Sequence, residues 1–461
     1  MTTIKLDPGA ALLLDALHGA GHAAYAVGGC VRDSLLGLDP HDWDLCTSAR
    51  PEQVMALFGE EKCIPTGLQH GTVTVKQGGR LYETTTFRTE GAYSDGRHPD
   101  AVCFVPDVRE DLARRDFTIN AMAYSAEKGL IDPFGGRDDL AAHLVRAVGE
   151  PERRFEEDAL RILRLYRFAA RFGFAIDPAT GAAARALGPH LDCVSAERIQ
   201  EELLKLLAAP RPGSYLEPAV LAVVLPELEP EKQPERFAEL CRTIDRIEPT
   251  AENVPARLAA LLCPLGEAGA RKALRKLKCS NALTDEVTAL VGGSVGSFLL
   301  GHETGHSIAR PIACGNRVPP QRTVLGETSD TSVQTPCGTP VSEEEALSTP
   351  GSEMQLTAKR LLGRFELPTI QRLTALCSAR HPEQAEAFAA LRAEAEQLTA
   401  ENACCRVSQL AVNGRDLMAA GVRPGPGLRQ VLNALLEAVI TGQTPNEKDA
   451  LLAAAAQFSA S

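Results

Sequence analysis

Two aspartates stand two residues apart in the first tenth of the chain. Asp42 and Asp44 flank Trp43. On an extended strand successive side chains alternate, so both carboxylates would project from one face and the tryptophan from the other. Carboxylates placed in this way can share hard divalent cations. A turn carrying two surface acids is the alternative, and for this short pattern alone it is the commoner case.

A pair of glycines precedes these acids. Gly28 and Gly29 follow the apolar residues 24–27, which predict a buried strand, and a helix is expected to begin near Val31. Glycine between a strand and a helix lets backbone N–H groups come close to a phosphate. Arg32 could add a bidentate contact to the same group.

Two further stretches place polar residues among apolar ones. Residues 114–122 hold two arginines, an acid and an amide around Phe117 and Ile119, and such groups need partners when they are buried. Residues 150–169 have the spacing of one long helix. On that helix Asp158 and Arg161 would share a face, while further arginines rotate away from it. Alternatively, the two residues form an ordinary surface salt bridge that contributes little to stability.

The elements that position these residues change in character along the chain. Strands are expected at 42–46, 72–76, 81–88 and 101–105, and a helix at 8–20. Almost only helical spacing follows residue 141, and 293–353 are rich in Gly, Ser, Thr and Pro without periodicity. We therefore predict an α+β head at 1–140, helical segments at 141–215 and 216–292, a flexible insertion at 293–353 and a helical tail at 354–461.

The length and composition of the chain restrict the class of protein to which it can belong. The 461 residues carry a net charge of −12, which argues against a surface coated in positive charge but allows a local basic channel. No apolar run long enough to span a membrane and no signal peptide are evident, so we expect a cytoplasmic protein. The 13 cysteines are scattered and form no CxxC pair, which is typical of reduced, mostly buried thiols.

Taken together, the motifs resemble those of the class II tRNA nucleotidyltransferases, the CCA-adding enzymes of the polymerase-beta-like superfamily. Five motifs occur in family order, and a set of this length and order is highly specific. They lie at 28–44, 114–122, 132–140, 157–164 and 196–203. Residues 410–427 also resemble the tail of the bacterial branch, whereas 293–353 match nothing in the family.

The resemblance implies a polymerase-beta-like head with a small mixed sheet, followed by an all-helical neck, body and tail. It also implies that CTP and ATP are added to the 3′ end of tRNA without a template. Asp42 and Asp44 would be catalytic and hold Mg²⁺. Asp158 and Arg161 would read the base, because a carboxylate and a guanidinium match the amino group and ring nitrogen of cytosine and adenine. The remaining nucleotide contacts would come from Gly29, Arg32, Arg115, Asp116, Asn120, Arg164 and Arg167.

Several alternatives stay open at this stage. Residues 87–99 look like the flexible loop that CC-adding members lack, so an A-adding enzyme or a poly(A) polymerase are the nearest rivals. More distant ones are a catalytically silent RNA-binding relative and a transferase acting on protein or antibiotic hydroxyls. His302 and His306 fit HExxH in a setting unsuited to a helix, and Glu83 is read as a plain strand acid or a third carboxylate. RNA would lie on a local basic face of the helical part. The oligomeric state is open, with a homodimer among the options.

Overall fold

The computed structural model describes residues 3–91, 102–295 and 350–458. The chain divides into two compact units, each with its own contacts. The first contains residues 1–295 and 365–392, and the second contains 296–364 and 393–461. Most of the predicted insertion (296–349), residues 92–99 of the predicted loop and the HExxH histidines lie outside the described residues. No helix of the described residues is long and apolar enough to cross a membrane.

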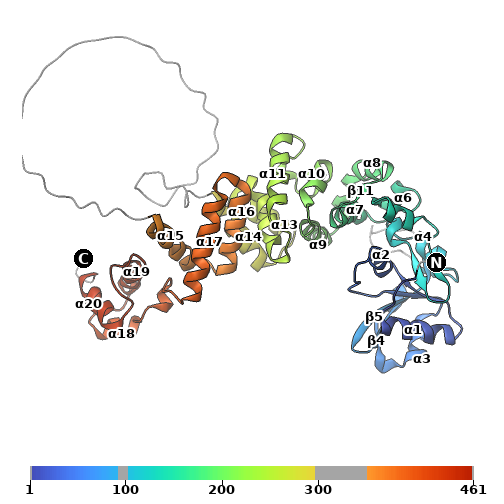
Figure 1. The fold of residues 1–461 in the computed structure, drawn as a ribbon, viewed down its shortest axis with the longest axis horizontal. Coiled ribbons are helices and arrows are strands. Elements are labelled where there is room, and N and C mark those ends of the chain that lie inside the picture. The colour runs from blue at the N-terminus through green and yellow to red at the C-terminus, as the bar shows by residue number, and fades with distance from the viewer. Residues whose placement is uncertain (1–2, 92–101, 296–349, 459–461) are drawn as a thin grey trace, which may run out of the picture. The chain divides into compact units, whose positions relative to one another are not determined.

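The first unit begins with a seven-stranded mixed sheet in the order β3-β4-β5-β2-β1-β8-β9. β2 pairs in parallel with β5, with Leu45 opposite Thr84, and the other neighbours are antiparallel. Figure 1 shows this sheet at the N-terminal end of the chain. Its strands are β1 (Ala24–Val27), β2 (Leu45–Thr47), β3 (Cys63–Gly67), β4 (Thr72–Gln77), β5 (Arg80–Thr86), β8 (Ala123–Ser125) and β9 (Gly129–Ile131).

Short helices pack around the sheet. The first of them starts at Asp7, whose carboxylate accepts hydrogen bonds from the N–H groups of Gly9 and Ala10 and so caps free helix donors. The apolar contacts of the head centre on buried residues such as Tyr25, Phe87 and Leu112. The helices are α1 (Pro8–Gly19), α2 (Gly29–Leu35), α3 (Pro51–Phe58), α4 (Val108–Ala113) and α5 (Gly136–Ala141), and β6 (Arg88–Glu90) pairs with β7 (Val102–Phe104) beside them.

The predicted long helix at 150–169 is wrong in one respect, because the chain breaks at Asp158. α6 (Pro151–Glu157) ends there, Asp158 is extended with φ −148° and ψ 102°, and α7 (Leu160–Phe172) begins two residues later. α7 is buried on several sides and packs against α9 (Ala196–Leu207). α8 (Pro178–Ala186) and the two-residue parallel pair of β10 (Leu144–Val145) with β11 (Ala175–Ile176) complete this region.

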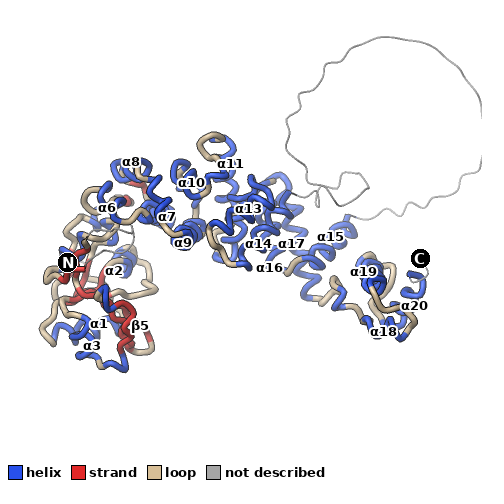
Figure 2. The backbone as a smooth tube through the Cα atoms, turned by 180° about the vertical axis from the view of Figure 1, so that it is seen from behind, coloured by secondary structure: helices blue, strands red, loops and turns tan. Residues whose placement is uncertain are grey.

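The rest of the first unit is helical, as Figure 2 shows by colour. At the junction with α9, the fully buried Arg257 donates to the carbonyls of Leu207, Ala209 and Ile247 at 2.5 to 3.1 Å. Within the described ranges, every hydrogen bond of this buried cation thus goes to a backbone carbonyl oxygen. The helices are α10 (Pro218–Val224), α11 (Pro234–Arg246), α12 (Val254–Leu262), α13 (Gly266–Lys276), α14 (Asn281–Val295), α16 (Leu367–Arg380) and the first half of α17 (Ala385–Ala400).

The second unit is a smaller set of helices with its own apolar cluster. Leu417, Leu435 and Leu451 are completely buried in it. Its helices are α15 (Pro350–Arg364), α18 (Gly414–Ala419), α19 (Pro426–Ile440) and α20 (Lys448–Phe458). The mixed sheet followed by helices confirms the α+β class predicted from the sequence, and residues 293–295 and 350–353, at the two ends of the predicted insertion, are helical.

Short 3-10 helices connect many of these elements. They are η1 (Glu60–Lys62), η2 (Leu68–His70), η3 (Thr118–Asn120), η4 (Gly188–Cys193), η5 (Pro212–Tyr215), η6 (Pro226–Leu228), η7 (Ala251–Asn253), η8 (Cys263–Leu265), η9 (Pro382–Gln384) and η10 (Val407–Gln409).

Candidate nucleotide and metal site

The glycine turn between β1 and α2 lets an arginine lie against the backbone. Gly28 has φ 77°, and a Cβ atom placed there would come within 2.9 Å of Arg115 Nη1. Any residue other than glycine would therefore be strained and would also collide with the guanidinium. The structure brings together the first motif and Arg115 of the second, as the sequence predicts.

Arg115 is positioned by an acid that sequence reasoning missed. Asp111 of α4 is completely buried and pairs with Arg114 at 2.9 Å and with Arg115 at 3.4 Å. The same carboxylate accepts a hydrogen bond from the backbone N–H of Arg88, where β6 begins. The spacing of three and four residues on a predicted helix was the available signal.

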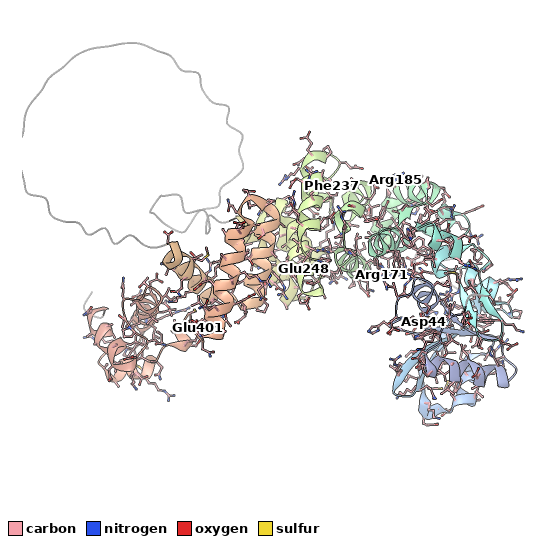
Figure 3. All side chains as sticks on the ribbon, in the orientation of Figure 1. Asp44, Arg171, Arg185, Phe237, Glu248 and Glu401 are labelled. Carbon is pink, nitrogen blue, oxygen red and sulfur yellow. The ribbon has the colours of Figure 1, made fainter. Side chains whose placement is uncertain are left out.

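The two motif aspartates lie just before β2 rather than on the predicted strand. They nevertheless alternate as expected, since Asp42 and Asp44 are exposed while Trp43 is 6% exposed. The carbonyl of Asp44 accepts a hydrogen bond from Val27 N–H at 3.0 Å, which attaches the segment to β1. This bond places Asp44 beside the end of β1, at the start of the inner strand β2, and Figure 3 labels Asp44.

Asp44 carries the most perturbed carboxylate of this group. It reaches solvent, but its surroundings desolvate it, and this effect, followed by the negative charge of Glu83, raises its pKa to about 6. Arg115 opposes the shift and Asp42 adds to it. Negative groups that repel one another in this way would be relieved by a cation. The negative charge of Glu83 on β5 therefore acts on Asp44.

The donor set fits a hard divalent ion whose coordination is shared with a substrate. Among the described residues no cluster of three or more His, Cys, Asp or Glu side chains forms a ready metal cage. Mg²⁺ commonly binds through one or two carboxylates together with waters and phosphate oxygens. Asp42 and Asp44 can supply such a pair of carboxylates.

A buried chain of polar side chains connects the first motif to the second. Arg32, which is 3% exposed, donates from Nε to Asp33 at 2.8 Å and from Nη1 to Asn120 Oδ1 at 2.5 Å. Asn120 donates in turn to Asp116 at 3.0 Å. Asp116 lies between η3 and α7, where it accepts two hydrogen bonds from Arg164.

The charge of Asp116 is maintained by its partners. Burial by itself would raise its pKa, but Arg164 and the hydrogen bond from Asn120 hold it well below the usual range. An ionised carboxylate at this depth is stable only because it is paired and hydrogen-bonded.

Aromatic rings of α7 fill the space between the arginines. The guanidinium carbons of Arg32, Arg164 and Arg167 lie 5.2, 5.3 and 4.1 Å from the centre of the Phe168 ring. Phe172 stacks with Phe168 at 6.3 Å. Cations within about 6 Å of a ring face are attracted to it, so the rings let like charges gather.

Glu202 of α9 is a second acid that sequence reasoning missed. It is 4% exposed, and its Oε2 lies 2.6 Å from Arg167 Nε and its Oε1 lies 3.8 Å from Arg164 Nη1. Glu202 lies within the fifth sequence motif, 196–203, so the signal was present although no role was assigned to it.

The predicted shared face of Asp158 and Arg161 is wrong, because the chain breaks between α6 and α7. Asp158 accepts hydrogen bonds from Arg198 at 2.7 Å and from the N–H of Leu160 at 3.1 Å. Arg161 instead pairs with Glu157 at 2.8 Å. Both residues lie beside the arginines of α7, but each has its own partner.

Residues of the third motif (132–140) form hydrogen bonds and close contacts with the second motif (114–122). The Asp139 carboxylate accepts a hydrogen bond from the Thr118 hydroxyl at 2.7 Å, and Asp132 accepts from the N–H groups of Gly136 and Arg137. A Cβ atom on Gly136 would lie 2.2 Å from the carbonyl oxygen of Thr118. Only glycine therefore allows α5 to approach η3 so closely.

Three protein-family models match the chain. The poly A polymerase head domain matches residues 24–146, the probable RNA and SrmB-binding site of polymerase A matches 173–232, and a putative tRNA nucleotidyltransferase domain 2 matches 359–455. The first range contains both aspartates and the second motif.

Curated relatives and solved structures agree with these matches. The CCA-adding enzyme of Geobacillus stearothermophilus is 34% identical over 96% of this chain and 94% of its own length, and that of Levilactobacillus brevis is 35% identical over 96% of both. The structure of the Bacillus stearothermophilus CCA-adding enzyme in complex with CTP is 30% identical with a TM-score of 0.72, covering 98% of both chains. A Thermotoga maritima CCA-adding enzyme complexed with tRNA shares the fold at 21% identity and a TM-score of 0.63.

Proposed function

The chain belongs to the family of CCA-adding tRNA nucleotidyltransferases, and on that premise we propose that Asp42 and Asp44 form its catalytic centre. The protein adds the CCA sequence to the 3′ end of tRNA from CTP and ATP, without a template, and releases pyrophosphate. The observation that carries the assignment of the centre is the pair of aspartates beside β1, with Arg115 and Glu83 around them.

We propose Mg²⁺ as the divalent ion that the family requires, held by Asp42 and Asp44 because both offer carboxylate oxygens. The chemistry that such an ion supplies when bound is neutralisation of charge at the attacking hydroxyl and at the triphosphate. Gly29, Arg32 and Arg115 would contact the triphosphate, and both arginine side chains lie close to the glycine turn. Asp116 and Asn120 would lie by the ribose.

Selection of the base is proposed for Asp158 and Arg161. Cytosine and adenine present an amino donor beside a ring-nitrogen acceptor, which match a carboxylate and a guanidinium respectively. Uracil and guanine present a carbonyl beside an N–H, so both contacts would be mismatched and left unpaired.

The contacts of Arg161 leave it able to serve in this way. Two hydrogen bonds from Nη1 and one from Nη2 go to Glu157 and to the carbonyls of Arg154 and Arg114. Of the five N–H donors of a guanidinium, the Nε–H and one on Nη2 have no acceptor among the described residues. These bonds hold the group in place while donors remain for a base. Arg164 and Arg167 would close the nucleotide pocket.

A terminal-addition assay tests the function. The substrate is a tRNA transcript lacking its last three nucleotides, supplied with Mg²⁺ and with CTP and ATP separately and together, and the products are sequenced. We expect growth by CCA followed by arrest, and loss of all addition in Asp42→Ala. Addition only to tRNA that already ends in CC would indicate an A-adding enzyme, and long A tails a poly(A) polymerase.

A further inference from the structure

A row of exposed cations lies on α13, outside every segment that the family models match. Five of the eight residues from 271 to 278 are Lys or Arg, in a chain whose net charge is −12. We infer that this face holds the sugar-phosphate backbone of the tRNA acceptor arm and guides its 3′ end to the nucleotide site. The inference rests on the proposed function and adds the surface that binds the substrate.

Three of the cations share one side of the helix. Lys272, Arg275 and Lys276 are exposed and are spaced three and four residues apart, which places them on one face over about 6 Å of helix axis. The opposite face is apolar. It consists of Ala270, Ala273, Leu274 and Leu277, all of them buried.

These three cations are also free, in contrast to their neighbours. Within the part of the chain that the structure describes, none of the three forms an ion pair, whereas Arg271 pairs with Asp285 and Lys278 with Glu197, both at 2.7 Å. The flanking acids thus neutralise the edges of the row and leave its centre positive. Unpaired cations on one face match a polyanion such as RNA.

The C-terminal end of α13 is linked through α9 to Asp158, one of the two residues proposed to read the base. Lys278, just beyond the end of α13, pairs with Glu197 in the first turn of α9, and the next residue, Arg198, binds Asp158. Figure 1 shows α13 and α9 close together at this point. The two ion pairs connect the end of the row to Asp158 through neighbouring residues of α9. Double-stranded RNA is bound mainly through its shape and its backbone, and a row of cations suits that mode of binding.

Cations in the last turn of a helix also stabilise it through the helix dipole. Arg275 and Lys276 occupy that turn, while Lys272 lies before it. A purely structural role would lower the melting temperature of a variant without changing the salt dependence of RNA binding. The two roles can therefore be separated by measurement.

The test reverses the row in the full chain as K272E/R275E/K276E. We expect the KM for tRNA to rise at least tenfold at low salt, while kcat and the KM for CTP stay within about twofold. Binding of tRNA, measured by fluorescence anisotropy at several KCl concentrations, should show a salt slope smaller by about two to three, roughly one for each lost phosphate contact.

The matched control is K62E/K76E/R137E. It makes the same change of net charge at three exposed cations of the head that also lack an acidic partner among the described residues. An unchanged KM for tRNA and an unchanged salt slope in the α13 variant would overturn the inference. So would an equal loss in the control, or a fall in kcat alone.

A second variant, K272Q/R275Q/K276Q, keeps the inference testable if charge reversal impairs folding, which circular dichroism and thermal melting would reveal. The salt slope of its tRNA binding should be smaller than that of the parent by a similar amount. If the unmodified protein adds no nucleotide to tRNA, the proposed function fails, and the binding measurement alone then decides the inference.

Discussion

Arg164 of α7 donates two hydrogen bonds to one carboxylate oxygen of Asp116, from Nε at 2.9 Å and from Nη2 at 2.6 Å. The pair joins the second sequence motif to α7, the helix whose arginines we propose to close the nucleotide pocket. It is the central link of the chain of contacts that runs from Arg32 to Glu202.

Replacing Asp116 by Asn should destabilise the protein by about 3 kcal/mol, because Arg164 would lose its charged partner at a mostly buried site. Urea unfolding of the full chain measures the change, and nucleotide addition should fall with it. The control is Asp138→Asn, an exposed acid of α5, which should leave both quantities unchanged. A loss below about 1 kcal/mol would contradict the assigned importance of the pair.

The same pair predicts a pH dependence of stability. The pKa of Asp116 is lower in the folded protein than its unfolded value of 3.8. Its contribution to the free energy of unfolding is therefore complete above pH 3.8 and is lost as the pH falls through the lower folded pKa. The difference in unfolding free energy between the parent and Asp116→Asn should therefore stay constant from neutral pH to about 4 and shrink only at more acidic pH. If this difference already vanished near pH 6, the pKa of Asp116 would not be lowered in the folded protein.

Asp158→Ala should weaken discrimination against UTP and GTP. The variant lacks the acceptor that pairs with the amino group of cytosine and adenine, so correct nucleotides lose a contact that wrong ones never made. Competition between CTP and UTP on tRNA lacking CCA gives the ratio of kcat/KM, which we expect to fall at least tenfold. Glu156→Ala, an exposed residue of α6, is the control. Full selectivity in Asp158→Ala would refute the proposed reading of the base.

Glu202→Gln should raise the KM for both nucleotides about tenfold, because Arg167 loses the charge that positions it and small displacements in such sites are costly. Glu201→Gln on the same helix is a close control, since Glu201 is exposed and, among the residues that the structure describes, forms an ion pair only with Lys205 on the surface. Equal effects of the two substitutions would show that Glu202 has no positioning role.

Binding of Mg²⁺ should depend on the ionisation of Asp44. Protonation as pH falls through about 6 removes a negative ligand, so the Mg²⁺ concentration needed for half-maximal addition should rise below that pH. Glu83→Gln removes a charge that raises this pKa, so the rise should move to lower pH. Glu52→Gln on α3 serves as the control. An identical profile in Glu83→Gln and the parent would exclude coupling of the two acids.

The sequence predicted the parts of the site that depend on local patterns. β1 has the predicted bounds, the glycine turn lies where expected, and Asp42 and Asp44 alternate with a buried Trp43 although they precede the strand. Alternation and glycine geometry are properties of neighbouring residues, so they can be read without knowledge of the fold.

The break at Asp158 could not be read in this way. No glycine or proline interrupts residues 152–172, and helical spacing continues through them. The break depends on Arg198, forty residues away, and on the cap that Asp158 gives to Leu160. The partners of Glu202 were missed for a related reason, because Arg164 and Arg167 lie on another helix, far away in the sequence. The partners of Asp111 were indicated by a spacing of three and four residues, but no pairing was predicted from it.

Arg164 and Arg257, which each join helices of the first unit to neighbouring segments, differ in what holds them. Arg164 depends on a carboxylate that can be protonated, whereas the bonds from Arg257 end on peptide carbonyls, which do not titrate. Protonation of Asp116 should therefore weaken the contact between α7 and the head. The hydrogen bonds between Arg257 of α12 and the end of α9 should persist. Acid below about pH 4 would then disrupt the proposed nucleotide pocket before α12 separates from α9, and the order of these events would identify which junction had failed.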